Sequence, residues 1–405
     1  MGAFSDTTMR EHHAPLIEKY VDLWIRRLKE AMGEEKHGTS TTTTVTTSSG
    51  SVGGRTITVN MVSWLNFLTF DISGDLSFGE SFGSTARGEP HAWVDVASEY
   101  GKGIALIASL NYFGGPLQKL LRFVMPASVR RKMAYHRDWT AEKVRKRLEW
   151  KEKRADFMGS VINYNLSTKE GKMGEGEKEV SIQELDLNMA TLVFAGSETT
   201  SSAVSVVLFE LLKEPDILKR VQTEVRSAFE HEKDINVASC GAKLEYLSAA
   251  INEGMRLGPP SVIGVPRVVK GSSGQGICGK WVPPGTYLAV NQYAAFRATA
   301  NFTDASKFKP ERFLSTSKSS EGDDDDGDDN DDLAVFQPFI LGRHTCIGQK
   351  FAWAEMRLVL ARLLYAFDMS RAESSSSTLG DWGEQKTFIF WEKKPIEVCL
   401  TSASS

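Results

Sequence analysis

In the stretch Phe339-Ile340-Leu341-Gly342-Arg343-His344-Thr345-Cys346-Ile347-Gly348, one cysteine stands between glycines, just ahead of an apolar segment with helical spacing. A single cysteine is most often a small buried hydrophobe. Here the peptide N–H groups and the positive end of the following helix favour a thiolate. The glycines let the backbone approach a flat cofactor closely. Cys346 is therefore a candidate iron ligand.

Bulk composition sets the limits of the problem. The chain has 405 residues, enough for one large core or for two to three domains. Its net charge of -4 shows no footprint for nucleic-acid binding. The four cysteines (Cys240, Cys278, Cys346 and Cys399) form no CxxC pair, which argues against a disulfide framework and a structural zinc site. No uninterrupted apolar run reaches the roughly 18 residues of a membrane span.

Hydrophobic periodicity predicts a mainly α chain with small β-sheets, and no alternating βαβ pattern. Ser181 and Glu184 form a capping box at the start of the longest helix. Two low-complexity insertions, 37–54 and 319–332, interrupt the pattern, and the acidic run 321–332 is interpreted as a solvated loop. We expect helices over 9–33, 60–83, 91–110, 128–156, 182–213, 215–230, 244–257 and from Cys346 to about 367, with strand-like segments over 262–295 and 386–400.

The segment Gly274-Gln275-Gly276-Ile277-Cys278-Gly279 matches the GxGxxG pattern of dinucleotide-binding loops. That fingerprint requires a helix directly after it, and Lys280-Trp281-Val282-Pro283-Pro284 cannot form one. We therefore predict a hairpin turn here.

The middle of the longest helix reads Ala195-Gly196-Ser197-Glu198-Thr199-Thr200. Glycine weakens a helix, and serine or threonine can bond back to the preceding turn and bend it. An acid beside a hydroxyl in an otherwise apolar helix suggests a proton relay. The alternative is a simple kink with a solvated glutamate.

Glu253 and Arg256 lie three residues apart on one face of a predicted helix, and Pro310-Glu311-Arg312-Phe313 offers a second guanidinium. Most such pairs are surface salt bridges that contribute little to stability. The neighbours of this pair are apolar, so burial is expected, and a buried pair needs further partners.

Four motifs follow one another along the chain: the helix segment 195–200, the pair Glu253 and Arg256, the segment 310–313 and the cysteine loop 339–348. In this order they resemble the cytochrome P-450 family of haem-thiolate monooxygenases. The resemblance covers essentially the whole chain, and segments 74–82 and 342–346 are similar to those of fungal secondary-metabolism members such as trichothecene-pathway hydroxylases. It implies a single P-450 domain over 1–405. Because the family normally begins well before Met1, with an anchor, the first strands and a further helix, we expect a P-450 fold lacking its N-terminal part.

The resemblance assigns the haem-binding residues as follows. Cys346 would be the axial thiolate of haem b, with Phe339 packed beside the sulfur. Gly342 and Gly348 would allow close backbone approach. His344 stands where most members have arginine and would meet one haem propionate. A second propionate would meet Arg267.

It also assigns residues around the cofactor. Glu198 and Thr199 would deliver protons during turnover. Glu253, Arg256 and Arg312 would form a structural triad beneath the cysteine loop. The distal pocket would be lined by Ala195, Met189, Leu192, Val262 and Ile263.

The implied function is insertion of one oxygen atom of O2 into a small apolar metabolite, by hydroxylation or epoxidation, in fungal secondary-metabolite or mycotoxin biosynthesis. Electrons would come from an NADPH-cytochrome P-450 reductase. Relatives are anchored to the endoplasmic reticulum, whereas this chain shows no transmembrane segment, so a cytoplasmic location is the alternative. Two other functions stay open: a non-catalytic truncated remnant, and a haem-thiolate isomerase or dehydratase. The Glu198–Thr199 pair speaks against the isomerase or dehydratase, because those enzymes do not need to protonate oxygen.

Overall fold

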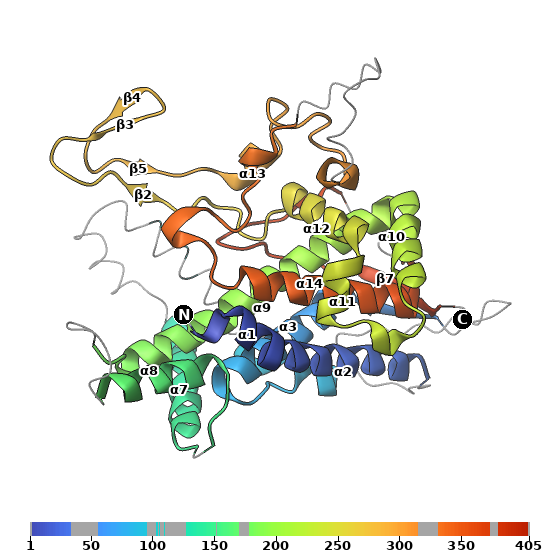
Figure 1. The fold of residues 1–405 in the computed structure, drawn as a ribbon, viewed down its shortest axis with the longest axis horizontal. Coiled ribbons are helices and arrows are strands. Elements are labelled where there is room, and N and C mark those ends of the chain that lie inside the picture. The colour runs from blue at the N-terminus through green and yellow to red at the C-terminus, as the bar shows by residue number, and fades with distance from the viewer. Residues whose placement is uncertain are drawn as a thin grey trace.

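The structure is a computed structural model, and it describes residues 2–33, 56–94, 103, 105, 109, 127–150, 152–169, 178–314, 331–372 and 380–403. Most of these residues form a helical body, from which one thin arm of short strands projects (Figure 1). The main helices are α2 (Ala14–Gly33), α3 (Met61–Phe78), α7 (Ala127–Leu148), α8 (Phe157–Lys169), α9 (Ile182–Lys213), α10 (Pro215–Ala228), α11 (Val237–Lys243), α12 (Glu245–Leu257) and α14 (Gln349–Ala366). Shorter ones are η1 (Gly2–Phe4), α1 (Asp6–Thr8), η2 (Met9–His13), α4 (Ser84–Arg87), η3 (Glu232–Asp234), α13 (Gln292–Phe296), η4 (Pro310–Phe313), η6 (Leu333–Val335), η7 (Gly342–His344) and η9 (Trp382–Glu384).

Helix α9 is the centre of the body and contacts α3, α7, α10, α12 and α14. The predicted capping box is confirmed: the Glu184 backbone N–H donates to Ser181 Oγ at 3.2 Å, and the Ser181 N–H donates to Glu184 Oε2 at 2.8 Å. Among the helices of the described segments, α9 alone is long and apolar enough to cross a membrane. However, 72% of its most apolar 18-residue stretch is buried inside the protein. A core helix has this character too.

Glycine in α9 has a packing role. A side-chain carbon on Gly196 would lie 2.9 Å from Ser73 Oγ of α3, so this residue lets the two helices approach closely. The back-bonding expected of the hydroxyl residues is present as well. Ser197 Oγ donates to the Val193 carbonyl at 2.6 Å, and Thr199 Oγ1 donates to the Ala195 carbonyl at 2.6 Å.

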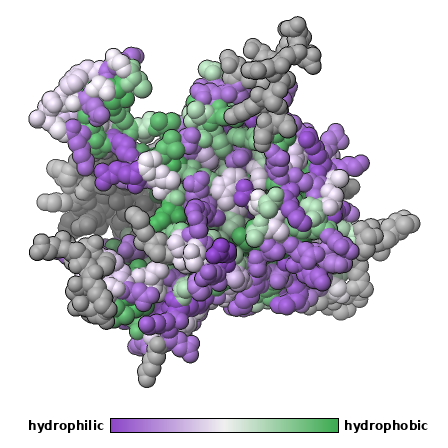
Figure 2. Space-filling model, viewed as in Figure 1, coloured by the Kyte–Doolittle hydropathy of each residue, from purple (hydrophilic) through white to green (hydrophobic). Residues whose placement is uncertain are grey.

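Helix α2 buries a stripe at helical spacing, which includes Ile17, Val21, Trp24 and Leu28. The indole N–H of Trp24 donates to the carbonyl of Trp64 in α3 at 3.1 Å, so this large side chain is packed without leaving its donor unpaired. The outer face of α2 is charged, and Figure 2 shows a mainly hydrophilic surface over it.

Three small antiparallel sheets complete the described fold. One has the strand order β1-β7-β6, formed by β1 (Thr56–Asn60), β7 (Glu397–Ser402) and β6 (Phe367–Arg371), with Ile57 opposite Leu400 and Asp368 opposite Thr401. The others are the pairs β2 (Arg267–Val268) with β5 (Tyr287–Leu288) and β3 (Gln275–Ile277) with β4 (Lys280–Val282).

The predicted hairpin turn is confirmed, since Cys278 and Gly279 connect β3 to β4 with φ of 48° and 73°. A two-residue hairpin turn whose central residues both have positive φ matches the right-handed twist of the two strands that it connects. The GxGxxG match therefore has no dinucleotide-binding geometry.

Several boundaries differ from the prediction. The expected helix 128–156 ends at Leu148, and a separate helix α8 begins at Phe157. Asp156 explains the break: its buried carboxylate accepts from the Gly159 N–H at 2.6 Å and pairs with Arg147 at 2.9 Å. Strands β1 and β6 were not predicted. The expected helix over 91–110 falls mostly outside the described residues, as do insertion 37–54 and most of 319–332.

His13 is a buried histidine that should make the fold sensitive to acid. It is fully buried against Phe157, with ring centroids 5.3 Å apart, and neither ring nitrogen has a hydrogen-bond partner among the described residues. Burial, with a smaller contribution from His12, lowers the pKa of His13 from 6.5 to about 4.

Because the folded pKa lies below the unfolded one, stability is full above about pH 6.5 and falls as the pH drops toward 4. We expect this histidine to account for a loss of about 3 kcal/mol in the free energy of unfolding over that range. His13→Leu should flatten part of the decline in urea unfolding between pH 7 and 4. Burial also lowers the pKa of His136 to about 4, so some decline remains. The exposed control His231→Leu should keep the full decline, and equal pH profiles for all three proteins would refute the assignment.

Candidate active site

A cavity of about 240 Å³ lies between the middle of α9 and the loop that precedes α14. The α9 side includes Leu192, Ala195 and Thr199. The loop side includes Phe339, His344, Cys346, Ile347 and Gly348. The lining is mostly apolar, so a hydrophobic molecule is the kind of occupant that it suits.

The cysteine loop is held in a compact turn. The Cys346 N–H donates to the carbonyl of Phe339 at 2.9 Å, which closes the loop across the residues between them. Gly342 has a φ of 78°, a conformation that favours glycine. A side-chain carbon on Gly348 would lie 3.9 Å from Cys346 Sγ, which is an ordinary van der Waals distance. The loop therefore presents one thiol to the cavity with its backbone fixed.

The electrostatics of the thiol differ from the sequence expectation. Burial raises the pKa of Cys346, and the Gly348 N–H only partly offsets this by lowering it. The protein by itself therefore favours the neutral thiol. A thiolate at this position requires a cation at the sulfur, which a bound metal would supply.

The side chains of Glu198 and Thr199 in α9 point in different directions. Thr199 lines the cavity, whereas Glu198 does not. The Glu198 side chain is 10% exposed and forms an ion pair with Lys393 Nζ at 2.7 Å, beside a second cavity that both residues line with Phe388 and Phe390. Lys393 Nζ also lies 3.2 Å from Ser201 Oγ. The alternative of a solvated glutamate is therefore wrong.

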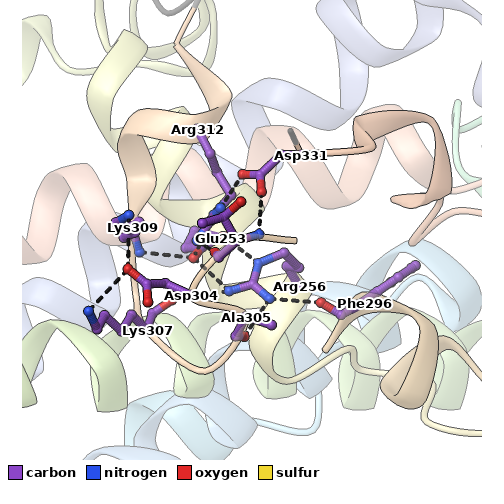
Figure 3. Close-up of polar contacts among 10 residues, drawn as sticks. Glu253, Arg256, Phe296, Asp304, Ala305, Lys307, Lys309, Arg312 and Asp331 are labelled. Carbon is purple, nitrogen blue, oxygen red and sulfur yellow. Dashed lines mark hydrogen bonds and ion pairs between the residues drawn. The ribbon is translucent and has the colours of Figure 1, made fainter. Parts of the chain in front are cut away.

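Glu253, Arg256 and Arg312 are brought together in a buried cluster (Figure 3). Arg256 donates from Nε to Glu253 Oε2 at 2.7 Å and from Nη2 to Oε1 at 2.8 Å. Arg312 Nε lies 3.1 Å from Glu253 Oε1. Arg256 Nη1 also donates to the carbonyls of Phe296 and Ala305, at 2.7 and 2.8 Å, so the buried charges have the extra partners that they need.

This cluster supports the segment that leads to the cysteine. Arg312 also pairs with Asp331, whose side chain is 7% exposed, so this one residue of the acidic run is a buried partner. Burial would lower the pKa of Arg312, but Glu253 and Asp331 outweigh it and raise the pKa. The same segment is also held by Gln292 of α13, whose Nε2 donates to the carbonyl of Gln337 at 2.9 Å. Gln337 is two residues before Phe339.

The other predicted residues are distributed unevenly. Ala195, Leu192 and His344 lie on the cavity lining. Met189 and Val262 are buried but do not line it, and Ile263 is 43% exposed. Arg267 is exposed on β2, where its Nη1 lies 3.3 Å from the carbonyls of Val265 and Pro266 and not at the cavity. In Figure 2, hydrophobic residues gather where the arm formed by strands β2 to β5 joins the helical body.

Sequence reasoning missed an aromatic wall of the cavity. Phe4 stacks on Phe157 at 4.8 Å, and Phe157 meets Phe351 at 6.1 Å, with all three on the lining. These residues come from η1, α8 and α14, and no local pattern connects them. Thr200, Lys393 and the buried Glu355 of α14 were also missed. A glutamate within an otherwise apolar helix was the available signal for Glu355.

A central long helix and a cysteine on the lining of an apolar cavity form the arrangement that a haem-thiolate protein needs. The chain belongs to the cytochrome P-450 family, whose model, "Cytochrome P450", matches residues 3–400. It is thus a monooxygenase of the type that fungal secondary metabolism uses, as its relatives indicate.

The chain is 36% identical over 394 residues to cytochrome P-450 monooxygenase astJ of Aspergillus oryzae, covering 97% of this chain and 70% of that protein. It is 35% identical over 400 residues to averantin hydroxylase of Dothistroma septosporum, covering 98% and 67%. The crystal structure of the cytochrome P-450DA haem domain superposes with a TM-score of 0.74 over 99% of this chain and 75% of that one. At 18% identity, that likeness concerns the fold.

The family implies haem, and the cysteine side of the cavity fits it. A thiol lines an apolar cavity, and His344 on the same lining can meet a carboxylate.

Proposed function

We propose that this chain uses haem b to insert one oxygen atom of O2 into a small apolar metabolite, with electrons from an NADPH-dependent reductase. The supporting observation is the cavity between Thr199 and Cys346, because it places a soft sulfur ligand opposite a hydroxyl in an apolar surrounding. Bound haem supplies the oxygen activation, and its thiolate ligand favours O–O cleavage.

The chain's own residues would bind, orient and shield the reactants. Cys346 would hold the iron, with Phe339 beside its sulfur and Gly342 and Gly348 giving backbone access. His344 would meet a propionate. Arg267 would meet the second propionate, which requires β2 to approach the cavity more closely than it does in this structure.

Above the cofactor, Ala195 and Leu192 would contact the substrate. The Thr199 hydroxyl would pass protons toward the reacting oxygen. Glu198 would supply those protons once its ion pair with Lys393 opens. Glu253, Arg256 and Arg312 would maintain the loop that carries Cys346.

An apolar lining supports an apolar substrate, because unpaired polar groups would lose hydrogen bonds with water on entering it. Family membership leads us to propose a single catalytic domain over 1–405 and association with the endoplasmic reticulum membrane.

The test is spectroscopic first. The haem-loaded protein, reduced and exposed to carbon monoxide, should give the red-shifted Soret band of a thiolate ligand. Turnover of ethylbenzene with reductase, NADPH and isotopically labelled O2 should then place one labelled oxygen in the alcohol. Label arriving from water, or no thiolate band, would overturn the proposal.

A further inference from the structure

The turn that follows α12 forms part of the wall of the active-site cavity. Pro260 and Ser261 line that cavity, together with Met255 of α12. Pro259 and Pro260 have no backbone N–H, so this part of the turn cannot donate backbone hydrogen bonds of its own. Its position therefore depends on the groups that bind its carbonyl oxygens and on the side chains that pack against it.

One hydrogen bond holds this turn from a distant segment. The indole N–H of Trp391 donates to the carbonyl of Pro259 at 2.9 Å, across 132 residues of sequence. In the described parts of the chain, no other hydrogen bond connects residues 259–266 with a segment outside 258–267. Both partners are buried. Such a bond is a strong restraint, because separating the two groups leaves a buried donor and a buried acceptor unpaired.

Trp391 is itself held in place. The Glu392 N–H donates to the carbonyl of Lys386 at 2.8 Å and closes the turn that carries the indole. The ring meets Tyr293 of α13 and Trp382 of η9 nearly edge-on, with centroids 5.7 and 6.1 Å apart. Trp391 also lines the second cavity, so it is not packed on every side. The hydrogen bond therefore fixes how the indole and the turn after α12 lie relative to each other.

Trp391 does not line the active-site cavity, so any effect on a bound substrate passes through the turn. Without the indole N–H, the buried carbonyl of Pro259 would lack its partner. A buried unpaired carbonyl is costly and rare, so the backbone would move to satisfy it. Because Pro260 and Ser261 directly follow, that movement would change the cavity wall.

We propose that Trp391 is a positioning residue that sets the orientation of the substrate by anchoring the Pro259–Ser261 turn. An apolar substrate in an apolar cavity has few polar groups to hold it, so the shape of the wall decides how it lies. A displaced wall lets the substrate adopt further orientations, and different C–H bonds then reach the reacting centre. This inference rests on the proposed function.

Bound ethylbenzene tests this inference without turnover. In the ferric haem-loaded protein, the paramagnetic iron relaxes the nearby protons of ethylbenzene, so the ratio of methyl to ring-proton relaxation rates reports its orientation. We expect Trp391→Phe to change that ratio and to keep the red-shifted Soret band of the carbon monoxide complex. Incorporation of 3-benzothienylalanine at position 391 keeps the bicyclic shape but replaces the N–H by sulfur. It should change the ratio in the same direction.

The matched control is Trp382→Phe. Trp382 is a second buried tryptophan of the same cluster, and a side-chain carbon on Gly258 would lie 2.7 Å from it, so it packs against the start of the same turn. Its indole nitrogen has no hydrogen-bond partner among the described residues. This replacement removes the same ring atoms but no hydrogen bond. It should therefore keep the wild-type relaxation ratio.

Turnover of ethylbenzene should divide the variants in the same way. Hydroxylation of its benzylic carbon gives two enantiomers of 1-phenylethanol, and their ratio depends on which of two hydrogens faces the reacting centre. Both changes at Trp391 should move the enantiomeric ratio several-fold toward one. Because the hydrogen bond acts on orientation and not on oxygen activation, the rate of NADPH oxidation should change less than the ratio does.

The outcomes separate the two proposals. A wild-type relaxation ratio in the 3-benzothienylalanine protein overturns this inference and leaves the proposed function intact. An equal change in Trp382→Phe has the same consequence, since loss of packing would then explain both. A chain that never forms the thiolate–carbon monoxide complex overturns the proposed function and this inference together.

Discussion

Replacing Cys346 with alanine is expected to abolish the red-shifted Soret band of the reduced carbon monoxide complex and to reduce monooxygenase turnover to background. The thiol is the sulfur on the cavity lining, and no other cysteine lines that cavity in the part of the chain that the structure describes. Loss of residues that merely orient metal ligands costs about 10–100-fold in affinity or activity, so loss of the ligand itself should cost more. Haem titration and the carbon monoxide spectrum measure both effects.

The fold should survive this change. Cys346 is exposed to the cavity, and its main structural contact is a backbone hydrogen bond to Phe339, which alanine retains. The matched control is Cys278→Ser, an exposed cysteine on the β3–β4 turn. It should keep the wild-type spectrum. A Cys346→Ala protein with an unchanged thiolate band would show that another group holds the iron.

Removing the Glu253 carboxylate should have the largest effect on stability. Glu253→Ala leaves two buried guanidinium groups without their shared anion, and breaking a buried pair typically costs about 3–5 kcal/mol. Because whole proteins are stable by only about 5–15 kcal/mol, this is a large fraction of the total. Urea unfolding followed by circular dichroism measures it.

The control lies in the same network. Lys307 pairs with Asp304 at 3.0 Å, but its side chain is 66% exposed, and Lys307→Ala keeps the backbone carbonyl that accepts from Arg256. We expect a change within about 1 kcal/mol, as for other exposed pairs. Arg312→Lys, which keeps the charge but loses the fork to Glu253 and Asp331, should fall between the two. Equal stability of the Glu253 and Lys307 variants would contradict a structural role for the cluster.

Local chemistry explains which parts of the fold were predictable. The capping box of Ser181 and Glu184 and the β3–β4 turn depend on residues within a few positions of each other, so their sequence carries the signal. Strand β1 was missed because it pairs with β7 from the far end of the chain. Strand β6 pairs with β7 as well, and in both cases the strand's own residues do not show which segment it will pair with. The break between α7 and α8 was missed because it depends on buried Asp156.

The site divides in the same way. The sequence by itself determined the family, the candidate iron ligand Cys346 and the acid–guanidinium pair of Glu253 and Arg256, because these are motifs of fixed spacing within single elements. Only the tertiary structure decided that Glu198 turns away toward Lys393, 195 residues distant, and that Glu355 is fully buried. The environment of an ionisable group is made by whatever packs against it, and in this chain those partners come from remote segments.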